Sequence, residues 1–192
     1  MNNILDAAAY ISYRYPALTG EDLDELKLHQ LLYLLQREAL AVLAQPAFEG
    51  DFEGWDCGPV SPEVMENTKD GKLVVSAKPL SSEIMTIADN VIDNYGIYAV
   101  WHLKDVLRAE TSWEKSREGL EPGEKGSHIL AMRDIWKDAK EVRPYDPVSG
   151  MYYDEMEDIP PEELDMPEEF WKWAKDFEKR SKEFVKRMEE EQ

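Results

Sequence analysis

The sequence predicts a mainly α-helical protein: a compact domain of about five or six helices with a minor β element, then an acidic connector and a C-terminal amphipathic helix. Three observations lead to this fold class. A long apolar run with helical spacing starts at Leu26, only residues 72–77 have a convincing β-rich composition, and the composition changes abruptly after Arg143. We therefore expect three parts: a helical domain over residues 1–143, a connector over 144–167 and a helix within 168–192.

The run from Leu26 to Gln45 predicts the helix around which the domain is organised. Its apolar residues keep steps of three or four, the spacing of one helix face, at positions 28, 31, 32, 35, 39, 42 and 43. Leu34, Leu40 and Ala41 widen this face, so we expect the helix to be buried on more than one side. Gln45 and Pro46 end it, because proline cannot continue the backbone ladder.

A shorter helix is expected before it, over residues 3–15, where apolar side chains share one face and Pro16 closes the helix. The turn Thr19-Gly20 then leads into four acidic residues, at positions 21, 22, 24 and 25. Acidic groups in or before a first helical turn suit the positive end of the helix dipole. This acidic group therefore marks the start of the central helix.

Residues 46–61 contain Pro, Gly, Asp and aromatic residues without a helical period, which predicts a loop with a short strand around 52–55. Ser61 suits the N-cap, and Pro62 the first position, of a short helix that stops near Asp70-Gly71. Residues 72–77 predict one small strand, or a second strand beside 52–55.

Four further helices are expected. One opens at residues 80–83 and ends at Tyr95-Gly96, where glycine suits the C-cap, and the next covers 97–107. After a Gly/Pro loop at 118–126, Ser127 is expected to cap a helix that reaches about Val142. The last runs from about 168 to 190, and its apolar stripe is rich in aromatic residues.

The charge balance is strongly acidic, with 41 Asp and Glu against 22 Lys and Arg, a net charge of −19. Ten of the acidic residues lie between Pro144 and Trp171, where there is no lysine or arginine, and this segment reads as an extended connector. Such a charge argues against direct binding of nucleic acid, whose phosphates it repels. It favours a basic protein partner, or simply gives high solubility.

The compartment is expected to be the cytoplasm. A single cysteine excludes an internal disulfide and a thiolate metal cluster, which indicates a reducing environment. The first residues lack the basic and apolar segments of a secretory signal, and no stretch approaches the eighteen apolar residues that a membrane span needs.

No residue pattern indicates catalysis. The three histidines, at 29, 102 and 128, lack the spacing of a metal site, and a lone helical histidine is more often packed or solvated than catalytic. Cys57 has no basic neighbour to lower its pKa, so a buried structural thiol is expected. There is no phosphate-binding glycine loop, nucleophile elbow or dinucleotide motif. The sequence predicts no metal and no cofactor, and a protein that is not an enzyme.

The segment after the central helix resembles a known family. It reads Trp-Asp-Cys-Gly-Pro-Val-Ser-Pro-Glu-Val over residues 55–64. This order is similar to the Panacea domain, also described as the SocA-like antitoxin domain, whose loop typically reads Trp-x-Tyr-Gly-Pro-Val-x-Pro-x-Val. Glu110 and Trp113 match the family's Glu-x-Pro-Trp ending, with Ser112 in place of the proline and Arg108 near the usual histidine. The resemblance covers roughly residues 3 to 118.

The resemblance implies an antitoxin that neutralises a cognate toxin protein by direct, stoichiometric binding. The family pairs with many unrelated toxins, including toxic small alarmone synthetase-like enzymes that act on nucleotides or tRNA. An acidic antitoxin would then meet a basic active-site cleft, since complementary charge speeds encounter and selects partners. The alternative is a proteolytic adaptor that delivers the toxin to a cellular protease, as described for one family member. Homo-oligomerisation stays open.

Two groups of residues are candidates for partner contact. The motif loop, with its two later matches, is either a rigid structural loop whose tryptophan plugs the core or a surface presented to a partner. The tail either packs on its own domain or inserts into a partner's groove, and the connector before it either blocks a basic active site or is a solvated linker. The motif-loop residues are Trp55, Gly58, Pro59, Val60, Pro62, Glu110 and Trp113, and the tail residues are Tyr152, Tyr153, Phe170, Trp171, Trp173, Phe177 and Phe184.

Overall fold

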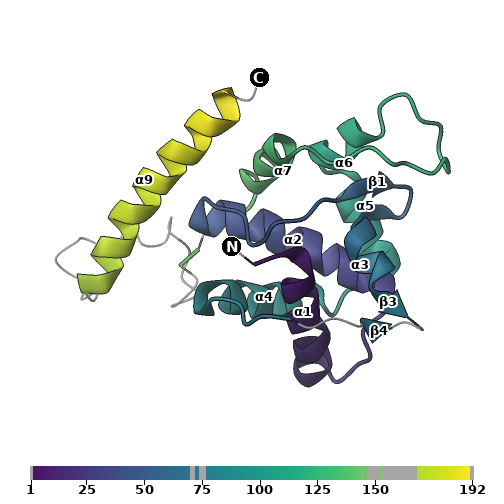
Figure 1. Cartoon of the computed structure of the whole chain (residues 1–192), viewed down its shortest axis with the longest axis horizontal. Coiled ribbons are helices and arrows are strands. Elements are labelled where there is room, and N and C mark those ends of the chain that lie inside the picture. Colours follow the sequence, from purple (N-terminus) through teal and green to yellow (C-terminus); the bar gives the residue numbers. More distant parts are fainter. Residues whose placement is uncertain are drawn as a thin grey trace.

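The domain is built around helix α2 (Glu25–Leu43), which lies at its centre in the computed structural model of the chain (Figure 1). The structure describes residues 2–69, 72–73, 77–143, 145–146, 152 and 168–190. Sixteen of the 19 residues of α2 are buried, which confirms that this helix is covered on more than one side. It begins at Asp24, whose carboxylate accepts the backbone N–H groups of Leu26 and Lys27. It ends at Leu43, slightly before the predicted end, because Ala44 takes a left-handed conformation with φ of 50°.

Two long helices cover one side of α2. Helix α1 (Ile4–Thr19) packs against both α2 and α4 (Ser82–Tyr95), and α4 also contacts α2. The prediction that Pro16 closes α1 was wrong, since the helix continues to Thr19. Proline there removes only the one backbone bond to Ser12, in a last turn that Gly20 closes by donating its N–H to the Pro16 carbonyl.

Helix α4 follows its prediction closely, with Ser81 as its N-cap and its end at Tyr95. Gly96 follows it with a φ of −62°, so this glycine is not required for a left-handed cap. The reason is space: a Cβ at this position would lie 2.4 Å from the Ile92 carbonyl oxygen. The close approach of Gly96 to α4 positions the segment that follows.

Two small antiparallel hairpins supply the β element. Strand β1 (Glu53–Trp55) pairs with β2 (Gly58–Val60), with Gly54 opposite Pro59. Strand β3 (Thr68–Lys69) pairs with β4 (Lys72–Leu73), so the second strand lies beside β3 and not beside residues 52–55. Between the hairpins, α3 (Pro62–Glu66) starts at the predicted N-cap Ser61 and ends at Glu66, before Asp70-Gly71.

The helix expected over residues 127–142 is shorter than predicted. Residues 128–130 are extended beside β1: the Leu130 N–H donates to the Phe52 carbonyl, and the Gly54 N–H donates to that of His128. Helix α7 is therefore confined to Met132–Ala139 and has Ala131, not Ser127, as its N-cap. The start of α7 is therefore set by pairing with β1, which is distant in sequence, and not by the capping potential of Ser127.

Two short helices complete this side of the domain. Helix α5 (Val100–Arg108) buries Leu103 and Leu107, while Val100 is only half-buried. Helix α6 (Thr111–Ser116) was not predicted, and it depends on a residue distant in sequence. The Asp138 carboxylate on α7 accepts the N–H groups of Thr111 and Ser112, at 2.8 and 3.0 Å, and so caps α6 from outside.

The predicted C-terminal helix forms as α9 (Glu168–Glu190). It contacts α2, and its Phe184 ring lies 6.0 Å from the ring of Trp136 on α7. With eight helices and two small hairpins in the described residues, the fold is mainly α with a minor β element, as predicted. Within the same residues, no helix combines the length and apolarity that crossing a bilayer requires.

Candidate functional site

Two of the motif residues, Trp55 and Trp113, are joined by a hydrogen bond, and Trp113 is buried beside two arginines. The guanidinium carbons of Arg108 and Arg117 lie 5.1 and 5.4 Å from its ring centroid, and its indole N–H donates to the Trp55 carbonyl at 2.8 Å. Arg117 also donates to the Gly54 carbonyl at 2.9 Å. The hairpin β1–β2 is thereby fixed to α6, and these groups have their bonding partners inside the domain.

Trp55 differs from its structural prediction, because it is half-buried and does not plug the core; among the tryptophans whose burial the structure describes, Trp113 is the buried one. The Trp55 ring faces the Lys125 ammonium at 4.6 Å, and its indole N–H donates to Glu53. Gly58, Pro59 and Val60 form the buried strand β2, and Gly58 has a φ of 115° that favours glycine. The motif loop is thus a rigid part of the scaffold with one tryptophan at its surface.

Glu110 belongs to a buried charge network on α2. Its carboxylate accepts from Arg37, which also lies 3.6 Å from Glu38 and donates to the Tyr95 hydroxyl at 3.0 Å. That hydroxyl in turn donates to Glu38 at 3.1 Å. Burial raises the pKa of both Glu38 and Glu110, and the Arg37 charge opposes this. The network joins α2, α4 and the start of α6.

Two groups with catalytic potential, His29 and Cys57, are at least half-buried. His29 is buried, its Nδ1 accepts the Ser61 N–H at 3.3 Å, and burial lowers its pKa to about 4. Cys57 is half-buried, and burial raises the pKa of its thiol, so it is not poised as a thiolate nucleophile. Within the described part of the chain, no three His, Cys, Asp or Glu side chains are grouped so as to hold a metal ion.

The tail residues that the structure describes lie against the protein itself. Phe184 is 2% exposed beside Trp136, and Phe177 is half-buried beside a cavity of about 220 Å³ between α9, α2 and α7. The Tyr152 ring lies 6.2 Å from that of Tyr145, with the Arg143 guanidinium over it at 3.9 Å. Tyr153 and the side chains of Phe170, Trp171 and Trp173 lie outside the described residues.

An exposed aromatic surface lies elsewhere, between α4 and α5. Ile97 is 77% exposed, Tyr98 42% and Trp101 69%, and the His102 ring lies within 6 Å of both aromatic rings, at 5.1 and 5.8 Å. We call Ile97, Tyr98, Trp101 and His102 the aromatic patch. Sequence reasoning assigned residues 97–107 to a helix and missed this patch. The available signal was the presence of three large residues, Ile97, Tyr98 and Trp101, within five positions after Gly96. They do not share the helix face that buries Leu103 and Leu107.

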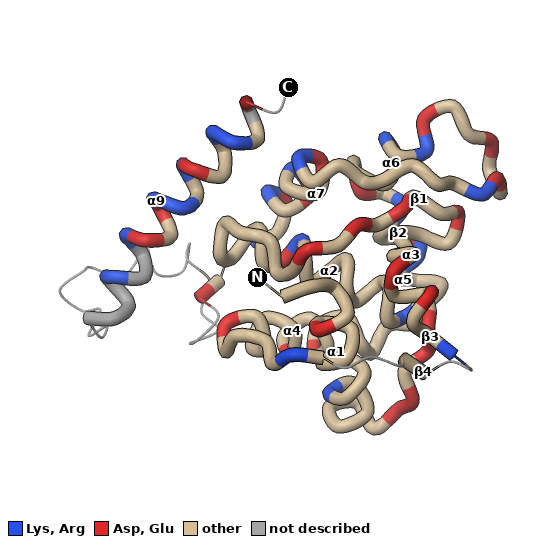
Figure 2. The backbone as a smooth tube through the Cα atoms, viewed as in Figure 1, with Lys and Arg blue, Asp and Glu red and all other residues tan. Residues whose placement is uncertain are grey.

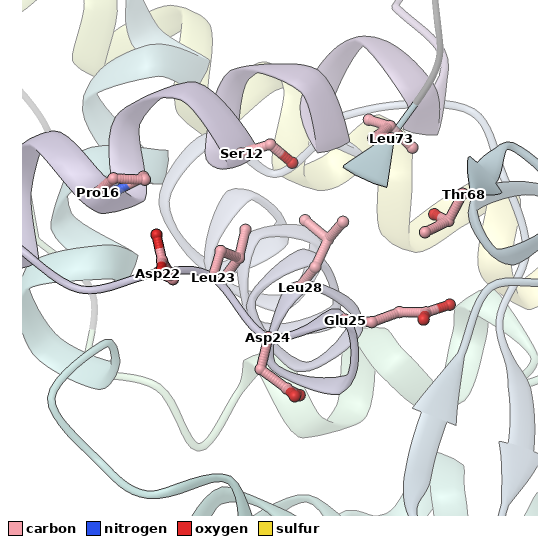
Figure 3. Close-up of a pocket in the computed structure, with 9 residues that line it drawn as sticks. All are labelled: Ser12, Pro16, Asp22, Leu23, Asp24, Glu25, Leu28, Thr68 and Leu73. Atoms are coloured by element: carbon pink, nitrogen blue, oxygen red, sulfur yellow. The ribbon is translucent and has the colours of Figure 1, made fainter. Parts of the chain in front are cut away.

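The acidic residues before α2 border a pocket of about 510 Å³ (Figure 3). The pocket lies between α1, the start of α2 and the hairpin β3–β4, and is lined by Ser12, Pro16, Asp22, Leu23, Asp24, Glu25, Leu28, Thr68 and Leu73. The Asp24 carboxylate turns away from it to cap α2. Apolar walls with acidic groups at the edge suit a lysine or arginine side chain, which has an apolar stem and a charged tip.

The described residues thus contain no metal-ligand group, and their surface features are the aromatic patch and the acidic pocket, on a small helical domain organised around one buried helix. Residues 28–114 match the model of the family described as Antitoxin SocA-like, Panacea domain. The resemblance seen in the sequence is thereby confirmed over that range, which begins in α2 and ends in α6. Comparison with curated proteins and with solved structures gives no match.

Proposed function

We propose that this protein is an antitoxin that neutralises a cognate toxin protein by direct, stoichiometric binding. The observation that carries this proposal is the match of residues 28–114 to the SocA-like antitoxin family. The surface supports it: the chain carries a net charge of −19, and a large aromatic patch is exposed within the matched range. Protein–protein contacts commonly combine exposed aromatic anchors with complementary charge at the rim.

The mechanism we propose is occlusion of a basic cleft on the toxin. Acidic groups lie along the turn before α2, in red between α1 and α2 in Figure 2. A toxin that binds nucleotides or nucleic acid needs a positively charged site, and an acidic protein surface competes for it. Burial of aromatic side chains would then supply most of the affinity.

The test is co-expression of the full chain with the product of the adjacent gene, read by growth and by co-purification. We expect the neighbouring product to stop growth, and the full chain to restore growth and to co-purify with it at a fixed ratio. A harmless neighbouring product that does not bind the chain would contradict the proposal. The toxin level must be measured in the same cells, because its disappearance on rescue would favour a proteolytic adaptor over neutralisation by binding.

A further inference from the structure

We propose that the aromatic patch, together with the acidic turn beside it, is the docking surface for a basic segment of the partner protein. The inference rests on the proposed function and gives it a location. It places the contact on the helical domain, at the N-terminal end of α2, and not on the aromatic stripe of α9.

The patch is held rigid from beneath. The Lys27 ammonium donates to the carbonyl oxygens of Gly96 and Tyr98, at 3.1 Å to Gly96. The Gln30 amide donates to the Val100 carbonyl at 3.0 Å, so two successive turns of α2 hold the segment 96–100. A surface whose backbone is already fixed loses less conformational entropy on binding, so more of its contact energy appears as affinity.

The same lysine places the acidic turn beside the patch. Burial lowers the pKa of Lys27, while the nearby charges of Glu21 and Asp24 oppose that shift. The contacts agree: the Asp24 carboxylate accepts the Lys27 N–H at 3.2 Å, and the Glu21 N–H donates to the hydroxyl of Thr19, whose side chain lies beside Gly96. The acidic turn therefore lies next to the patch segment. Figure 2 shows this acidic turn in red next to the start of α2.

Further acidic side chains adjoin the patch on its own elements. Asp105 is exposed and stands four residues after Trp101 on α5, which puts both on one helix face. Asp93 is exposed in the last turn of α4, just before the patch. Lys104 is the lysine of α5 near them. Acidic residues thus stand next to the aromatic residues on α4 and α5, and aromatic rings also bind the cations of lysine and arginine on their faces.

The chain's own tail helix does not occupy this surface. The cavity beneath α9 is lined by Leu40, Ala41 and Ala44, at the C-terminal end of α2, whereas the patch is held by Lys27 and Gln30 at the other end. A helix rises 1.5 Å per residue, so about 15 Å or more of α2 separates the two places. In the described residues, α9 and the patch are therefore distinct surfaces of the domain.

A second copy of this chain is a poor occupant, because two acidic rims would be brought together around the aromatic rings. A partner segment that carries lysine or arginine meets both features at once: its charge is attracted by the acidic residues, and its side-chain stems pack on Trp101 and Ile97. The partner we infer is thus a basic segment of the toxin.

The experiment uses the full chain and the product of the adjacent gene, with affinity measured by calorimetry and rescue measured by growth. Trp101→Ala and Ile97→Ser remove apolar contact, and Asp105→Lys reverses a rim charge. Tyr13→Ala is the matched aromatic control, because Tyr13 is 75% exposed on α1, and Glu178→Lys on α9 is the matched charge control. All five side chains are exposed, so a thermal melt of each variant should match that of the original protein.

We expect Trp101→Ala to weaken binding at least about 30-fold, the effect of an interface anchor worth about 2 kcal/mol, and Asp105→Lys to weaken it further as salt is lowered. Both control variants should bind within about twofold of the original protein. Unchanged binding by all three patch variants, with the original chain still binding and rescuing, would overturn the inference and leave the antitoxin function standing. Failure of the original chain to bind would contradict both the docking surface and the antitoxin function. If the original chain self-associates and Trp101→Ala does not, a second copy of this chain is the occupant instead.

Discussion

Helices α2 and α9 are the two longest helices in the described residues, and they carry their charged residues in opposite ways. Helix α2 buries six polar or charged side chains, namely Lys27, His29, Gln30, Gln36, Arg37 and Glu38. On α9, Phe184 is the buried residue among the side chains that the structure describes, and alternating acidic and basic residues face water (Figure 2). The first helix is part of the core, and the second is attached to it at a few points.

The physical consequence is a difference in what each charge contributes to stability. The ions of α9 form pairs four residues apart, such as Lys182 with Glu178 at 2.5 Å, and both side chains are largely exposed. Water and salt screen such pairs, so they contribute little. The ions of α2 are shielded from water, so removing one partner leaves an uncompensated buried charge. Four experiments test this contrast, from the largest effect to the smallest.

Arg37→Ala should have the largest effect. It leaves Glu38 and Glu110 buried without their cation, so we expect a loss of about 3–5 kcal/mol in the free energy of unfolding, measured by urea titration at pH 7.5. Arg14→Ala is the matched control, because the pair of Arg14 with Asp89 at 2.6 Å is partly exposed, and its loss should be clearly smaller. Equal losses for the two variants would mean that burial does not set the energetics of these charges.

Acid should act on α2 through His29. Its pKa is lowered to about 4 in the folded protein by burial, against 6.5 when unfolded, so between these values the unfolded chain binds the extra proton. Stability is thus full above pH 6.5 and falls as the pH drops toward 4; between pH 7.5 and 5 we expect a loss on the order of 2 kcal/mol from this group. Urea titrations at the two pH values measure it. His29→Gln should reduce the difference, while the same change at exposed His102 should keep it.

Phe184→Ala tests the attachment of α9. The buried Phe184 ring packs beside Trp136 of α7 and so attaches α9 to the domain. Without this ring, α9 should separate from the domain while the core stays folded. We expect a loss of about 1 kcal/mol or less in the domain's free energy of unfolding, measured by urea titration. Hydrogen exchange and proteolysis within residues 168–190 should increase strongly. A loss of about 3 kcal/mol or more, as for a core phenylalanine, would make α9 part of the same cooperative unit.

Glu178→Gln should have the smallest effect. It breaks the exposed pair with Lys182, and we expect no measurable change in the urea midpoint of the domain or in the binding of the partner. A shifted midpoint would show that surface pairs on α9 contribute to the cooperative core, against the contrast drawn between the two helices.

The positions of most helices could be predicted because their signals are local. Ser61 is the N-cap as expected, α4 opens within the predicted residues 80–83, and α9 covers the predicted residues. The failures have long-range causes. Residues 128–130 pair with β1 instead of starting a helix, and α6 forms because Asp138 caps it from α7. No window of the sequence contains both partners of either interaction.

The candidate site was less predictable than the fold. The motif loop could be recognised from its residue order, but its bonding to Trp113 and Arg117 shows a scaffold with Trp55 at its surface. The aromatic patch was hidden inside a segment predicted as helix. The exposure of Ile97 and Trp101 depends on where α4 ends and on which face of α5 meets α2. The local sequence pattern predicts neither.

The sequence by itself determined the helical class, the central helix and the family resemblance, because apolar spacing, caps and motif order are properties of neighbouring residues. Only the tertiary structure decided which charges are buried, which aromatic rings remain exposed and where α9 attaches. Burial is a property of the packed chain, and it sets the desolvation cost that distinguishes Arg37 from Lys182 and the contact area that distinguishes Trp101 from Trp113.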